Sequence, residues 1–176
     1  GMQMGQAALR TDGTQLNSEL PPETVAALDA WVQENASHLA AMQMNGQVLR
    51  IFEPWFVGLM VTIVELTKYG LDPAIGLDTH MAERARAANK PTSGLETGAE
   101  QIAFLDGMDP AEQLQFLQEA LKSGAEGQDA VEKLHNAWRA GDADTLWQEM
   151  AVEMRAQFPK LYHRINVERN DAWVPK

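Results

Sequence analysis

A run of thirteen residues, "PWFVGLMVTIVEL" at positions 54–66, constrains the fold more than any other part of the chain, because nearly every residue in it is apolar. A helix that crosses a membrane needs about twenty such residues. Charged residues also flank or interrupt the run at Glu53, Glu65 and Lys68. We therefore interpret it as a helix buried in a protein core, with Gly70 as its C-terminal cap.

Helical patterns on both sides of this run predict a mainly α, multi-helical, bundle-like fold. The predicted helices span residues 22–44, 54–66, 79–89, 110–122, 128–140, 143–157 and 159–173. The clearest start is "DPAEQ", where Asp109 as N-cap and Glu112 three residues later form a capping box. Asp78 is the expected cap of the helix over 79–89, and Gly141 the C-cap of the helix over 128–140. The only strand candidates are the short segments "QVLRIF" and "TSGLET".

The domain organisation follows from where these patterns begin. Residues 1–20 are polar and lack a sustained period, so we expect a flexible arm, and residues 21–176 form the helical segment. A chain of 176 residues suits one domain. The five tryptophans lie on apolar faces and are predicted to be core residues; they are Trp31, Trp55, Trp138, Trp147 and Trp173.

Charge and cysteine content exclude several classes of function. The net charge of −11 repels a phosphate backbone and anionic lipid surfaces, which argues against nucleic-acid or membrane binding. The chain has no cysteine, which rules out disulfides, zinc–thiolate clusters and cysteine nucleophiles. We expect neither a nucleic-acid partner nor a membrane span.

Three residues are candidates for chemistry on general grounds. Glu96, in "SGLETGAEQ", could serve as a general base or a metal ligand if it lined a cleft. Arg169, followed by Asn170, could recognise a carboxylate or phosphate, because a guanidinium offers a planar fork of donors. The plainer alternatives are a solvated glutamate and a surface arginine that pairs with a glutamate.

A metal site is conceivable around Asp78 and His80, at the start of the helix over 79–89. His80 and Glu83 are three residues apart and share a helix face. The alternative is a capped helix start with a surface histidine. The sequence contains no HExxH pair.

The order of the motifs is more specific than any one of them. "GLDTHMAERARAANKPTSGLETGAEQIAFLDGM", then "EQLQFLQEAL", "LHNAWRAGDADTL" and "FPKLYHRINVERNDAW", resemble the TraB/GumN family in sequence order. "QLNSELPPET" and "EPWFVGLM" upstream also fit, so the resemblance extends from about residue 9 to residue 173. It implies a bacterial GumN-like protein, related to the Tiki metal-dependent proteases, and suggests a periplasmic or cell-envelope location.

The resemblance also sets expectations for the fold and the site. In that family an α/β domain carries the active site, and its helical part packs over it. Carried over residue by residue, Glu96, Arg169 and Asn170 are catalytic candidates, and Glu96, His80 and Asp78 are metal candidates. The family's N-terminal Gly-Thr-x-His motif and its C-terminal histidine motif do not occur here. We therefore expect a middle fragment, inactive by itself and holding no cofactor of its own, although the intact protein could use a divalent metal.

Two functional hypotheses remain open at this point. One is a helical part of a metal-dependent hydrolase of unknown peptide or small-molecule substrate; the other is a non-enzymatic helical module for interaction or assembly. We also expect a homodimer, formed through an apolar face that combines the helix over 54–66 with Trp147, Met150 and Met154.

Overall fold

The computed structural model describes residues 2–176, without the side chains of Met2 and Pro73, and confirms a mainly α, multi-helical fold. In chain order the helices are α1 (Met2–Ala7), α2 (Pro22–Glu34), α3 (Ala36–Ala41), α4 (Gly46–Leu49), α5 (Pro54–Lys68), α6 (Leu77–Ala87), α7 (Gly98–Asp106), α8 (Pro110–Glu126), α9 (Gln128–Ala140), α10 (Ala143–Trp147), α11 (Glu153–Gln157), α12 (Pro159–Tyr162) and α13 (Arg169–Trp173), with 3-10 helices η1 (Leu16–Ser18) and η2 (Pro73–Ile75) and π-helices η3 (Gln148–Val152) and η4 (His163–Glu168). Within residues 2–176 there is no strand; Leu9 and Phe52 form an isolated β-bridge.

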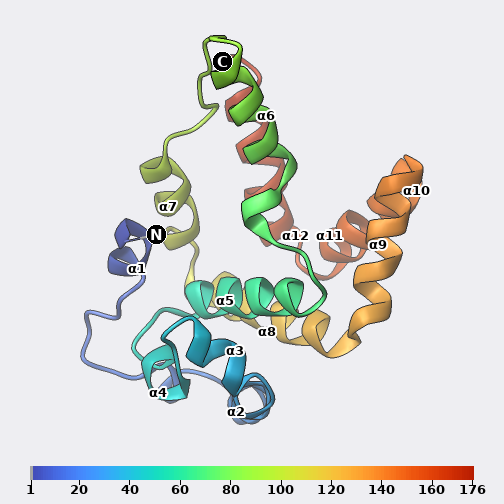
Figure 1. Ribbon diagram of the computed structural model, residues 1–176. Coiled ribbons are helices and arrows are strands. Elements are labelled where there is room, and N and C mark those ends of the chain that lie inside the picture. Colours follow the sequence, from blue (N-terminus) through green and yellow to red (C-terminus); the bar gives the residue numbers. More distant parts are fainter. Residues whose placement is uncertain (1) are drawn as a thin grey trace.

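Helices α5 and α8 lie along each other at the centre of the fold (Figure 1). The apolar run predicted to form a core helix is α5, and Trp55, Val57 and Val61 on it are fully buried. Gly58 lets α8 come close, because a Cβ at this position would lie 3.2 Å from the Cα of Leu117. The α5–α8 pair is therefore the platform from which the other helices extend.

A buried carboxylate lies in this core at Glu65, which is 6% exposed. Trp31 of α2 donates its indole N–H to Glu65 Oε1 at 2.7 Å, and Lys68 Nζ lies 3.1 Å from Oε2. Gly124 of α8 faces the glutamate, where a Cβ would come within 3.1 Å of its Cγ. A buried charge needs such partners to offset its desolvation, so Glu65 links α2, α5 and α8.

The N-terminal segment packs against the core in this structure. Ala8 and Leu16 are fully buried. The side chain of Arg10 is 2% exposed and forms ion pairs with Asp12 (2.8 Å), Glu53 (3.3 Å) and Glu19. The flexible arm predicted for residues 1–20 thus contains α1, the 3-10 helix η1 and three core residues, Ala8, Leu16 and Leu20, while its mobility stays a prediction. Gly1 lies outside the described residues.

Local capping signals explain where several helices begin and end. The Asp109 capping box is confirmed, with Glu112 N–H donating to Asp109 Oδ1 at 2.8 Å and Asp109 N–H donating to Glu112 Oε2 at 2.9 Å. Gly141 ends α9 in the left-handed conformation, at φ 71°, as predicted. The predicted cap at Asp78 is wrong: Gly76 is the N-cap of α6, and Asp78 lies in its first turn.

The predicted helix over 22–44 is divided at Asn35 into α2 and α3. Asn35 is fully buried, and its side-chain amide donates to the carbonyl of Trp31 at 2.9 Å. Side-chain bonds of this kind compete with the helical ladder. The strand candidates are also wrong. "QVLRIF" contains most of α4 and ends at the bridge residue Phe52, and "TSGLET" forms a loop that ends at the N-cap Thr97.

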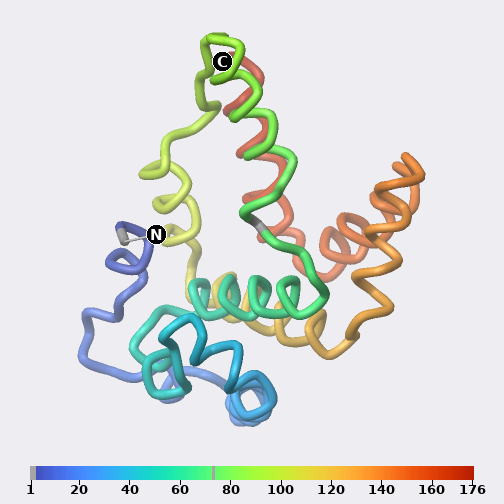
Figure 2. Tube along the Cα trace, in the orientation of Figure 1, coloured from blue at the N-terminus to red at the C-terminus, as the bar shows by residue number. Residues whose placement is uncertain are grey.

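Two arms extend from the α5–α8 pair. One contains α6, α7 and α12–α13, and the other is the α9–α10 hairpin, which projects away from the core (Figure 2). Trp31 and Trp55 are buried as predicted, but Trp138 is 60% and Trp147 47% exposed. Their assignment to the core is wrong, because neighbouring helices in the described residues cover these two side chains only in part; Trp147 has an edge-to-face contact with Tyr162 of α12.

Candidate functional site

The loop that carries Glu96 is held by the start of α7. Thr97 is the N-cap of this helix: its Oγ1 accepts a bond from the Glu100 N–H at 3.1 Å, and its own N–H donates to Glu100 Oε2 at 2.6 Å. This reciprocal pair is a capping box, encoded by the Thr-x-x-Glu spacing in "TGAE". It sets the direction in which the chain enters α7, and so positions Glu96 immediately before it.

Glu96 and Arg169, separated by 73 positions in the sequence, form a two-pronged ion pair. Arg169 Nε donates to Glu96 Oε2 at 2.9 Å, and Arg169 Nη2 donates to Oε1. Trp173, one helical turn after Arg169, donates its indole N–H to Oε2 at 3.3 Å. The guanidinium also lies 4.8 Å from the centre of the Trp173 ring. Both carboxylate oxygens are therefore held by α13 in a fixed orientation.

The electrostatics of the pair keep Glu96 ionised. The hydrogen bond from Arg169 lowers the pKa of Glu96, and the bond to Glu96 raises the pKa of Arg169. A general base works best with a pKa near the operating pH, so the lowered pKa argues against that role. The arrangement suits a carboxylate that acts as a fixed negative charge or ligand and an arginine that orients it.

Further contacts tie the C-terminal end of the chain to the same loop. Lys176 Nζ donates to the carbonyl of Leu95 at 2.8 Å and lies 3.7 Å from Glu100. Asn170 is exposed and takes no part in the hydrogen bonds to Glu96. Its catalytic role stays a prediction. Sequence reasoning missed Trp173 and Lys176; the spacing of four residues between Arg169 and Trp173 was the available signal.

Comparison with known protein families shows which family this chain belongs to. The model of the TraB/PrgY/gumN family matches residues 1–176. The chain belongs to the TraB/PrgY/gumN family. No curated protein and no solved structure matched it. The predicted resemblance to this family is thereby confirmed.

In this TraB/PrgY/gumN family chain, the predicted metal residues are not assembled into a site. Asp78 and His80 are exposed at the start of α6, an eleven-residue helix, whereas Glu96 lies in the loop beyond its far end. Residues 2–176 contain no group of three or more His, Asp or Glu side chains that could hold a metal ion. The donor set of Asp78, His80 and Glu96 therefore does not fit a metal centre. Whether any one of these three residues binds a metal together with other ligands stays a prediction.

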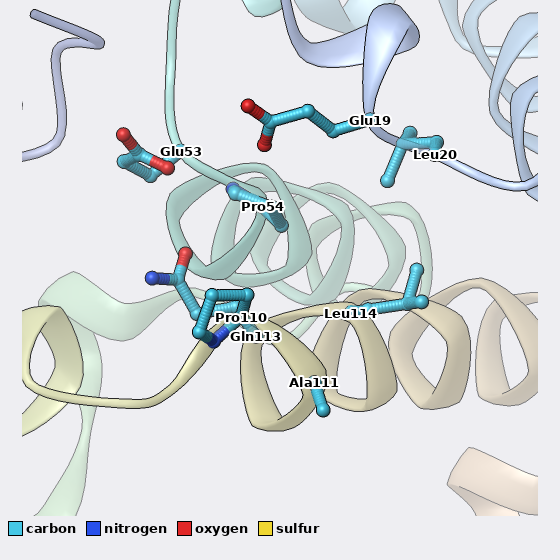
Figure 3. A pocket seen from close by; sticks show the side chains of 8 residues that line it. All are labelled: Glu19, Leu20, Glu53, Pro54, Pro110, Ala111, Gln113 and Leu114. Carbon is cyan, nitrogen blue, oxygen red and sulfur yellow. The ribbon is translucent and has the colours of Figure 1, made fainter. Parts of the chain in front are cut away.

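A pocket of about 270 Å³ opens where the N-terminal segment meets α5 and α8 (Figure 3). The carboxylates of Glu19 and Glu53 lie on one side of it, and both pair with Arg10. Burial raises the pKa of Glu53, although the charge of Arg10 opposes this. Gln113 and apolar side chains form the rest of its wall; these are Leu20, Pro54, Pro110, Ala111 and Leu114. Both carboxylates of the pocket are therefore already paired to Arg10, and these ion pairs join the N-terminal segment to the start of α5.

The membrane expectation can be checked against the helices. None of the helices in the described residues combines the length and apolar character needed to cross a bilayer. The longest apolar helix of this TraB/PrgY/gumN chain, α5, is used in the protein core.

Proposed function

We propose that this chain is the helical part of a metal-dependent hydrolase or protease and that Glu96, Arg169 and Asn170 contribute to its active site. The observation that carries the proposal is the ion pair between Glu96 and Arg169, which also involves Trp173. A planar guanidinium that donates to both carboxylate oxygens fixes the orientation of the carboxylate more narrowly than a lysine ammonium would. The chain belongs to the TraB/PrgY/gumN family, and the relation to metal-dependent proteases is what the resemblance of its motif order implies.

In this proposal Glu96 supplies an ionised carboxylate, and Arg169 is the residue that positions it. Arg169 does so by donating to both carboxylate oxygens, and each ionised oxygen keeps further acceptor capacity. Glu96 is 19% exposed, so part of the carboxylate is open to an approaching group. The chain by itself is inactive, because a catalytic metal takes about three protein ligands and residues 2–176 group no such set.

The test is calorimetric titration of the chain with Zn²⁺, Mn²⁺ and Co²⁺, alongside a peptide-hydrolysis assay with each metal. We expect neither a stoichiometric metal site at micromolar affinity nor hydrolysis above the blank. A one-to-one isotherm that disappears in Glu96→Gln but persists in Glu83→Gln would show that the chain alone holds a metal and would overturn its proposed inactivity.

The second candidate is a non-enzymatic module for interaction or assembly, and a separate observation favours it. The hairpin of α9, α10 and η3 exposes large apolar side chains, with Trp138 60% and Met150 62% exposed. Soluble chains rarely leave such groups clustered on an open surface without a partner. The two candidate functions are distinguished by which substitution impairs the protein. Substitution of Glu96 would matter only to the hydrolase, and substitution of Met150 only to assembly.

A further inference from the structure

The hairpin formed by α9, α10 and η3 carries three large apolar side chains that are exposed, and we call the surface that they form the hairpin face. It is defined by Trp138, Trp147 and Met150, which are 60%, 47% and 62% exposed. Trp147 makes an edge-to-face contact with Tyr162, with ring centroids 6.5 Å apart, and this fixes the orientation of its ring. The face is thus a pair of aromatic rings and a flexible thioether on a helical support, a composition typical of protein interfaces.

The sequence of α9 explains why this face is apolar. Val131, Leu134 and Trp138 recur at helical spacing and form one stripe along the helix. In α8 the equivalent stripe is covered, because Leu117 and Leu121 are buried against neighbouring helices. In α9 the only buried residue is Ala137. An amphipathic helix gains its stability mainly from covering its apolar stripe, and in the described part of the chain this stripe remains partly open.

The whole chain exposes more surface than a compact monomer of its size. Its solvent-accessible surface is 11361 Å², whereas a compact monomer of 19.5 kDa exposes about 8,500 Å². The excess is roughly 2,800 Å². An obligate homodimer buries about 2,000–5,000 Å² in total, so one copy contributes about half of that. The excess is therefore large enough to supply one copy's share of a stable dimer interface.

We propose that the hairpin face binds the hairpin face of a second copy of this chain in a two-fold symmetric homodimer. This placement replaces the predicted dimer face in part, because most of α5 is buried in the core, with Leu66 near its end 38% exposed, and Met154 is partly buried. Two acidic side chains beside the face are already paired within the chain: Glu149 with Lys133 at 2.8 Å and Glu153 with Lys122 at 2.7 Å. The proposal is independent of the hydrolase role of Glu96.

The test uses a matched pair of methionines. Met150 on the hairpin face is 62% exposed, and Met81 on α6, away from the face, is 55% exposed. Light scattering coupled to size exclusion should give about 39 kDa for the wild type, twice 19.5 kDa. Met150→Glu should raise the dimer dissociation constant about tenfold or more, while Met81→Glu should change it less than about twofold. Circular dichroism at 222 nm verifies that both variants keep their helices.

Ionic strength and cross-linking provide further readouts. Two copies of net charge −11 repel each other, so added salt should tighten an apolar dimer by screening that repulsion. Because the chain has no cysteine, a single Arg139→Cys beside Trp138 should allow a short bismaleimide to link two copies, whereas Arg86→Cys on α6 should not. A mass that stays at 19.5 kDa over a hundredfold concentration range, or equal dissociation constants for the two methionine variants, would overturn the proposal.

Discussion

At the scale of single residues, the ion pair between Glu96 and Arg169 predicts the direction in which one contribution to folding stability changes with pH. The hydrogen bond from Arg169 lowers the pKa of Glu96 below its ordinary value of 4.5. The ionised form is therefore favoured more in the folded than in the unfolded chain. The stability that results is complete above the unfolded pKa and is lost as the pH falls through the folded pKa.

Glu96→Gln should remove this contribution. We expect the melting temperature of the variant to fall less steeply than that of the wild type as the pH is lowered from about 5 to 3. At pH 7 the variant should lose only about 1 kcal/mol or less of unfolding free energy, because both partners are partly exposed. Thermal unfolding followed by circular dichroism measures both effects. The control is Glu83→Gln, on an exposed glutamate of α6 with no ion pair in residues 2–176. Equal slopes for the wild type and Glu96→Gln would contradict the assignment.

At the scale of elements, the close contact between α5 and α8 depends on Gly58. A Cβ there would lie 2.9 Å from Cδ1 of Phe116 and 3.2 Å from the Cα of Leu117. The Phe116 ring can rotate, but the Leu117 backbone cannot yield unless the two helices separate. Because α5 carries the largest group of buried residues, this separation would be transmitted to the whole core.

Gly58→Ala should therefore destabilise the protein although alanine is the better helix former. The helical preference of alanine contributes about 1 kcal/mol in favour, and overpacking costs about 1–3 kcal/mol, so we expect a net loss of about 1 kcal/mol. Gly5→Ala is the matched control, since Gly5 also lies within a helix but has nothing within 4 Å of the added Cβ. It should be neutral or slightly stabilising. Urea unfolding at constant pH measures the difference, and equal midpoints for the two variants would count against the tight contact.

At the scale of the whole molecule, burial is concentrated in the α5–α8 platform and is sparse in the arms. Nine residues of α5 are buried, and none of the described residues of α6 is. Regions with few buried contacts open at lower free energy than the core. The fold should therefore open from its arms, while the platform opens only on global unfolding.

Hydrogen exchange followed by mass spectrometry should show this order. Amides of α5 should exchange most slowly and amides of α6 among the fastest. The exchange of α9 should slow as the protein concentration rises if the hairpin face is covered by a second copy, while that of α6 should not change. Protection in α6 equal to that in α5 would contradict the division into platform and arms.

Many features of this protein were determined by the sequence alone because they depend on neighbours a few residues apart. The capping box at Asp109, the left-handed end of α9 at Gly141 and the buried helix of residues 54–66 all follow from local spacing and local hydrophobicity. The family follows from the order of motifs along the chain. The metal-ligand roles of Asp78 and His80 and the catalytic role of Asn170 stay predictions.

Other features were decided only by tertiary packing. Sequence singled out Glu96 and Arg169 separately, but their pairing and the contact with Trp173 join segments more than seventy residues apart. The same limit explains the tryptophans, since an apolar helical stripe looks alike whether another helix covers it, as at Trp31, or leaves it open, as at Trp138. Helical periodicity shows which side of a helix is apolar. Which surface covers that side depends on contacts between residues far apart in the sequence, and the free energy of those contacts cannot be inferred from a short segment.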